Sequence, residues 1–156
     1  MTAGVNCLKL IHHFEGCKLI AYKCPADVWT IGYGSTRYAD GLQVKEGDEI
    51  TQQQTDVLLM DTLRTYEAAV NRDVKVPLLN HQFDALVSFC YNIGVGNFHN
   101  SSLLKIVNVH QFDTEIPELF MRWKYAKGEI LMGLVRRRNA EAYLYMTGSL
   151  KFNFKP

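Results

Sequence analysis

The chain has 156 residues, which matches one ordinary domain and is long enough to bury a full hydrophobic core. Apolar residues make up 47% and charged residues 21%, values that exclude an intrinsically disordered chain. The formal net charge is only +1, so the overall charge gives no indication of a nucleic-acid partner.

The first segment predicts a helix over about 4–14. Apolar residues recur with roughly helical spacing from Val5 to Phe14, and Gly16 is placed to end the helix. The N-terminus lacks the basic start and the apolar core of a signal peptide, and nowhere do about 18 uncharged apolar residues follow one another. We therefore expect a protein made and held in the cytosol, without a membrane span.

Four cysteines are present, and in the cytosol they are expected to be reduced thiols. Their spacing matches no zinc site and includes no Cys-x-x-Cys pair. For each cysteine the general expectation is a small, buried apolar residue. The four are Cys7, Cys17, Cys24 and Cys90.

From about 18 to 42 the pattern becomes typical of β structure. Residues 29–36 are β-branched and aromatic, with glycines at turn positions, which predicts a small hairpin or a three-stranded sheet. Thr51 followed by Gln54 then predicts a helix N-cap, and the apolar spacing after it predicts a long helix over about 52–71.

The remainder of the chain predicts helices. A largely buried helix over 81–92 follows Pro77 and is expected to stop at the glycines of 94–96. Three further helices are predicted over about 102–107, 117–125 and 136–146, the last of them ended by Gly148.

Early strands and late helices indicate an α+β fold. We expect a single domain over residues 1–156, with a small N-terminal sheet lobe and a larger C-terminal helical lobe joined by the long helix. A cleft would then lie between the lobes, with Glu15 at its floor. The expected parts are a sheet lobe over about 16–50, a linking helix over about 52–71, and a helical lobe over about 72–156 packed with the helix over 4–14.

Glu15 is the first candidate for chemistry. By residue type alone, a glutamate at a helix end is most often solvated. Its place between Phe14 and Gly16, directly before the sheet segment, instead predicts a carboxyl against apolar surface. A carboxyl in such a setting keeps its proton to higher pH and can donate it near neutrality.

The spacing Glu15-x8-Cys24-x5-Thr30 resembles the catalytic signature of the phage-type lysozymes, glycoside hydrolase family 24, in which the middle position is Asp or Cys. The resemblance covers nearly the whole chain and is strongest toward endolysins of lambdoid-type phages and prophages. The further similar segments are 31–34, 80–89, 91–96, 101–104, 122–123 and 133–141.

The resemblance implies a lysozyme-like muramidase that cuts the β-1,4 bond between N-acetylmuramic acid and N-acetylglucosamine in peptidoglycan. It implies that Glu15 is the general acid and that Thr30 helps position the attacking water. Cys24 takes the place that is Asp in many members. No metal or cofactor is implied.

Three roles for Cys24 stay open at this point. The sulfur could act as a thiolate base or nucleophile, as a neutral thiol that shapes the site, or as passive filler, because a thiol becomes ionised only in a favourable environment. Asp27 is a further carboxylate in the same segment, although after Pro25 it is better explained as a turn residue.

Four more residues are candidates for the site. One arginine of the run 136–138 is expected to pair with Glu15, as the resemblance implies, and Arg136 is our choice. Tyr91 and Asn92 end a buried helix and could contact sugar by stacking and by amide hydrogen bonds. Ser101 could bind an acetamido group.

Partners and rival functions follow from these residues. Peptidoglycan is the expected substrate of a monomeric enzyme, with a holin-type pore giving passage from the cytoplasm to the wall. One rival is a cysteine-dependent cell-wall peptidase or amidase, with Cys24 as nucleophile and a base among His12, His13 and His81. Another is a lysozyme-like protein that binds glycan without cleaving it.

Overall fold

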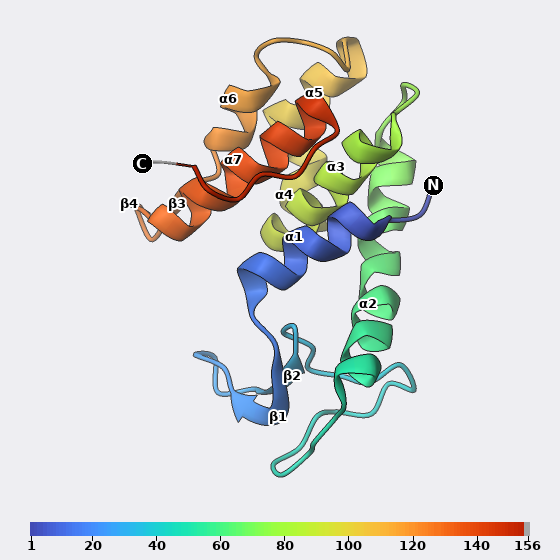
Figure 1. Ribbon diagram of the computed structural model, residues 1–156, viewed down its shortest axis with the longest axis vertical. Helices are drawn as coiled ribbons and strands as arrows, with labels where there is room; N and C mark the ends of the chain where they lie inside the picture. Colours follow the sequence, from blue (N-terminus) through green and yellow to red (C-terminus); the bar gives the residue numbers. More distant parts are fainter. Residues whose placement is uncertain (155–156) are drawn as a thin grey trace. The chain divides into compact units, whose positions relative to one another are not determined.

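The computed structural model describes residues 1–154 and divides into two compact units (Figure 1). The sheet unit comprises Ile11–Arg64, and the helical unit comprises Met1–Leu10 together with the chain from Thr65 onward. The chain crosses between the units twice, inside helix α1 (Val5–Glu15) and inside helix α2 (Gln52–Asp73).

The sheet unit contains an antiparallel hairpin of β1 (Lys18–Lys23) and β2 (Trp29–Gly32). The predicted hairpin is thereby confirmed. The sheet of this hairpin has two strands, and among the described residues further pairing with β1 is limited to an isolated bridge between Ile20 and Glu49. A small core of Ile31, Val44 and Leu58 supports the hairpin, and partly buried Trp29 and Ile50 pack against it.

The predicted start of α2 is confirmed in atomic detail. The Gln54 backbone N–H donates to Thr51 Oγ1 at 3.2 Å, and the Thr51 backbone N–H donates to Gln54 Oε1 at 2.7 Å. This reciprocal capping box satisfies two backbone donors that the first helical turn leaves without a partner. The helix runs two residues beyond its predicted end, to Asp73.

Helices make up most of the helical unit. They are α3 (Asn80–Ile93), α4 (Val95–Asn100), α5 (Ser102–Val109), α6 (Ile116–Met121) and α7 (Met132–Thr147). Helix α3 packs against α7 and α4, and α6 packs against both α7 and α5 (Figure 1). The middle of α3 is buried continuously from Gln82 to Cys90, as the sequence predicted.

Two elements differ from the sequence prediction. Helix α3 ends at Ile93 with Gly94 as its C-cap, so the predicted stop at the glycines is confirmed, but α4 was not predicted. The Gly94 carbonyl accepts the Phe98 N–H at 3.0 Å and this new helix begins at once, with Phe98 fully buried. Tyr125 was expected inside a helix, but it begins β3 (Tyr125–Ala126), which pairs with β4 (Glu129–Ile130). Lys127 and Gly128 both have positive φ, which matches the two-residue turns of right-twisted hairpins.

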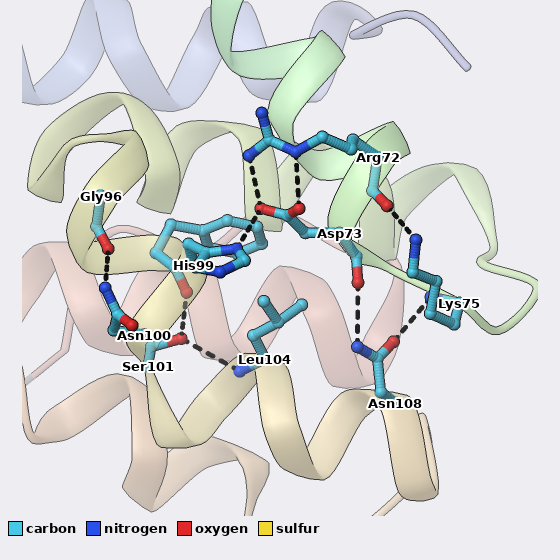
Figure 2. Close-up of polar contacts among 10 residues, drawn as sticks. Arg72, Asp73, Lys75, Gly96, His99, Asn100, Ser101, Leu104 and Asn108 are labelled. Carbon is cyan, nitrogen blue, oxygen red and sulfur yellow. Dashed lines mark hydrogen bonds and ion pairs between the residues drawn. The ribbon is translucent and has the colours of Figure 1, made fainter.

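A polar junction joins the end of α2 to α4 and α5 (Figure 2). The Asp73 carboxylate accepts from Arg72 Nε and Nη2 at 2.7 and 2.8 Å and lies 3.1 Å from His99 Nδ1. Its backbone carbonyl accepts from the Asn108 amide at 2.9 Å, and the Lys75 backbone N–H donates to the same amide side chain at 2.7 Å. All of these residues belong to the helical unit.

Candidate active site

Helix α1 ends at Glu15. Gly16 follows with φ +67°, a conformation that glycine adopts without steric cost, and the chain then turns into β1. Sequence reasoning expected the carboxyl to lie against apolar surface, whereas Glu15 is exposed. Glu15 is the last residue of α1, and the residues that follow it, 16–20, are exposed as well.

Cys24 lies in the tight turn between β1 and β2. Its backbone N–H donates to the Val28 carbonyl at 3.0 Å, and the Asp27 N–H donates to the Cys24 carbonyl at 2.8 Å. Hydrogen bonds to the sulfur from the backbones of Val28 and then Ala26 lower the pKa of the Cys24 thiol, and the nearby Thr30 side chain acts in the same direction. The turn therefore stabilises negative charge on the sulfur, much as it would on a carboxylate.

Thr30 is buried on β2, 3% exposed, and its hydroxyl donates to the Val28 carbonyl at 3.0 Å. It pairs with Tyr22 across the hairpin, and Cys24 lies two residues beyond Tyr22. The hairpin thus brings Thr30 and Cys24 into contact, although they are six positions apart in sequence.

The other polar residues of this turn have structural partners. Asp27 adopts φ +60°, and its exposed carboxylate pairs with Lys23 Nζ at 2.7 Å. These contacts agree with its interpretation as a turn residue. Among the other cysteines, Cys7 and Cys90 are buried as expected, but Cys17 is exposed, because it follows the turn at Gly16.

The predicted sugar-binding residues belong to the helical unit and all have protein partners. The Tyr91 ring packs edge-on against Tyr66, with centroids 5.2 Å apart, and Asn92 Oδ1 accepts from Arg138 Nη2 at 2.7 Å. Ser101 is buried, donates to the Phe98 carbonyl at 2.8 Å and accepts the Leu104 N–H at 3.1 Å. The structure thus shows Ser101 as the N-cap of α5, and its contact with an acetamido group stays a prediction.

The arginine run has an organisation that sequence reasoning missed. Arg136 is exposed, whereas Arg137 and Arg138 are 3% and 0% exposed. Their Nε atoms lie 3.1 and 3.0 Å from the two carboxylate oxygens of the fully buried Glu141, which also accepts from Ser88 Oγ at 2.8 Å. The spacing of four and three residues along a helix was the available signal. The pairing of Arg136 with Glu15 stays a prediction.

A family model described as phage lysozyme matches residues 12–141, a range that contains Glu15, Cys24 and Thr30 at the signature spacing. The chain belongs to the phage lysozyme family. The endolysin of Acyrthosiphon pisum secondary endosymbiont phage 1 is 40% identical over 88% of this lysozyme family member and 93% of that relative.

Two solved structures share the fold of this phage lysozyme. The endolysin from Escherichia coli O157:H7 phage FAHEc1 has a TM-score of 0.88 and 36% identity, with 97% of each chain covered. The muramidase domain of SpmX from Asticaccaulis excentricus has a TM-score of 0.83 and 36% identity, covering 94% of this chain and 98% of that domain. The α+β, lysozyme-like fold expected from sequence is therefore confirmed.

Proposed function

We infer that this phage lysozyme is an endolysin, a muramidase that hydrolyses the β-1,4 bond between N-acetylmuramic acid and N-acetylglucosamine in bacterial peptidoglycan and so lyses the host cell. The observation that carries this function is the family match over residues 12–141. The similarity to a solved muramidase domain over 94% of the chain supports it.

Within this function we propose Glu15 as the general acid. Its carboxyl donates a proton to the glycosidic oxygen while the bond from that oxygen to the anomeric carbon breaks. Its place at the signature position and at the end of α1 supports this role. Thr30 is proposed to orient the water that adds to the anomeric carbon, since a hydroxyl both donates and accepts hydrogen bonds.

Cys24 is proposed to serve as the anionic group that many family members supply with Asp. The hydrogen bonds that lower the pKa of its thiol raise the thiolate fraction near neutral pH above that of an ordinary cysteine. A thiolate there can take the proton that the attacking water loses, so that Glu15 and Cys24 together complete one hydrolysis.

Replacing Glu15 by Gln tests the acid assignment, because the amide keeps the shape and loses the proton. We expect the Glu15→Gln variant to lose at least about 100-fold in activity, the lower range for general acid catalysis. Turbidity loss of chloroform-treated Gram-negative cells and new reducing ends from purified peptidoglycan measure it. Glu46→Gln, an exposed change in the sheet unit, is the control and should remain active. A folded Glu15→Gln variant with wild-type activity would refute the assignment.

The products also separate the rival functions. A peptidase or amidase with Cys24 as nucleophile would release new free amines, and a protein that only binds glycan would release neither product. The Cys24 sulfur is surrounded by backbone donors of Val28 and Ala26, which suit an anion such as a carboxylate better than they suit a thiol paired with a histidine base. We expect reducing ends alone.

The location of the enzyme is a separate proposal. Among residues 1–154, none of the helices combines the length and the apolar character needed to cross a membrane. We propose that the protein acts as a monomer, accumulates in the host cytoplasm and reaches the wall after a holin-type pore opens.

A further inference from the structure

An aromatic stack lies one helical turn before Glu15, within the sheet unit. The imidazole of His12 lies flat on the ring of Tyr33, with ring centroids 4.5 Å apart and planes 8° from parallel. His12 and Glu15 are three residues apart in α1, so their side chains lie on the same side of the helix. The stack therefore contacts the helical face that carries the proposed acid.

Tyr33 contacts the chain on both sides of Glu15. Its ring stacks on His12, and its hydroxyl lies near the sulfur of Cys17. One side chain thus packs on α1 at residue 12 and lies near the chain again at residue 17. Tyr33 is itself well placed as an anchor, because it is only 5% exposed.

Residues at the start of α2 hold the Tyr33 side chain in place. A single amide group, Nε2 of Gln52, donates to the Tyr33 hydroxyl at 2.9 Å and to Asp56 Oδ1 at 3.0 Å. The same Asp56 oxygen lies 3.5 Å from Nε2 of His12. The four side chains of His12, Tyr33, Gln52 and Asp56 form a closed ring of contacts, which we call the His12–Tyr33 clamp.

The clamp connects the two segments that carry the proposed catalytic residues, the end of α1 with Glu15 and the strand β2 with Thr30. Tyr33 follows β2 directly, three residues after Thr30, so its position is tied to the threonine. Gly32, with φ +64°, lets this segment approach α2 closely, since an added Cβ would lie 2.8 Å from Thr55 Cγ2. His12 and Cys17 bracket Glu15. Tyr33 therefore connects the helical turn that carries Glu15 to the end of the strand that carries Thr30.

We propose that His12 and Tyr33 are positioning residues of this lysozyme, which hold Glu15 and Thr30 at the separation that hydrolysis requires. The inference rests on the proposed function of Glu15. Misplacement of a catalytic group by about 1 Å can cost on the order of 100-fold in rate, so a loosened clamp has a measurable effect.

The test compares His12→Ala, which removes the stacked ring, with His12→Phe, which restores a ring without the imidazole. Steady-state kinetics on soluble, uncrosslinked glycan strands from peptidoglycan separate kcat from KM. We expect His12→Ala to lower kcat and kcat/KM together by about tenfold or more with little change in KM. We expect His12→Phe to recover most of that loss. His110→Ala is the matched control, because exposed His110 also contacts an aromatic ring, that of Phe112.

Three outcomes would refute the proposed positioning role of the His12–Tyr33 clamp. One is wild-type kcat in His12→Ala. A second is an equal loss of kcat in His12→Ala and His12→Phe when circular dichroism shows both to be folded. A third is a loss that follows the unfolded fraction measured by urea titration, which would make the role purely structural. Failure of the proposed function is distinct, because the wild-type protein would then release no reducing ends.

Discussion

At the residue scale, the hairpin turn explains how Cys24 can fill the role proposed for it, which is the role of an anion. The Cys24 sulfur accepts hydrogen bonds from backbone groups of Val28 and Ala26 that depend on the turn and not on the side chain. An aspartate oxygen accepts the same bonds, as Asp does in many turns. We propose that the backbone of this turn stabilises an anion, which Cys24 supplies in this chain and which Asp would supply equally well.

A substitution series at Cys24 tests this interpretation. We expect Cys24→Asp to remain active and Cys24→Ala to lose most activity at pH 7. We expect wild-type activity to rise with pH as the Cys24 sulfur ionises. Because its thiol pKa is lowered, this rise should begin at a lower pH than for an ordinary cysteine. In Cys24→Asp that rise moves to lower pH, because carboxylates ionise near pH 4. Reducing-end release across pH 4 to about 9 measures both effects.

Asp27→Asn is the control for the Cys24 series, since asparagine also tolerates the positive φ at this exposed position. It should leave activity and its pH dependence unchanged. Full activity in Cys24→Ala would show that the sulfur has no chemical role.

At the element scale, the long helix α2 depends on a polar junction at its C-terminal end. The Asp73 side chain is 6% exposed, and its hydrogen bonds to Arg72 and His99 lower its pKa to about 2. An acid whose pKa is lowered on folding stabilises the folded state above its unfolded pKa, near 4, and that stabilisation is lost as the pH falls toward 2. The junction (Figure 2) is therefore an acid-sensitive contact between α2 and α4, whereas the bond from Asn108 of α5 goes to the Asp73 backbone carbonyl and does not depend on the carboxylate.

Asp73→Asn should accordingly destabilise the protein at neutral pH. We expect the free energy of unfolding to fall by about 1–3 kcal/mol at pH 7, the usual cost of losing hydrogen bonds to a charged group. The difference from wild type should shrink as the pH is lowered from 4 to about 2, because wild-type Asp73 is then protonated too. Urea unfolding at several pH values measures it. Asp61→Asn, which breaks the ion pair between a half-buried Asp61 and the exposed Arg64, should cost less than about 1 kcal/mol. A pH-independent difference would contradict the acid linkage.

At the scale of the whole molecule, the helical unit contains a buried charge cluster. Arg137, Arg138 and Glu141 are on one face of α7, and Ser88 reaches the cluster from α3. The Arg138 guanidinium also lies over the Phe89 ring, 5.0 Å from its centroid. Charges buried this deeply are tolerated only when they are paired, so Glu141 is expected to be essential to folding.

We expect Glu141→Gln to lower the free energy of unfolding by about 3–5 kcal/mol, because two buried guanidinium groups would lose their counter-ion. Urea unfolding followed by circular dichroism checks this value. Glu118→Gln, an exposed change on α6, is the matched control and should stay within about 0.5 kcal/mol of wild type. A cost below about 1 kcal/mol for Glu141→Gln would show that the cluster contributes little net stability.

The sequence by itself determined features that depend on local spacing. The reciprocal bonds of Thr51 and Gln54 were predictable because a capping box joins residues three apart. The hairpin, the buried face of α3 and the family membership likewise follow from short patterns in order along the chain. The hairpin at 125–130 was missed, because its turn of Lys127 and Gly128 is a weak local signal.

Only the tertiary structure decided which of these residues meet partners far away in the chain. Arg137 and Arg138 are buried and Arg136 is exposed because the packing of α7 selects one helical face, which three consecutive arginines cannot reveal. Tyr33 contacts His12 and Gln52, each about twenty positions away, and no local pattern records such contacts. Local hydrogen bonds can be predicted from the spacing of residues along the sequence, whereas burial and long-range pairing arise only when the whole chain packs.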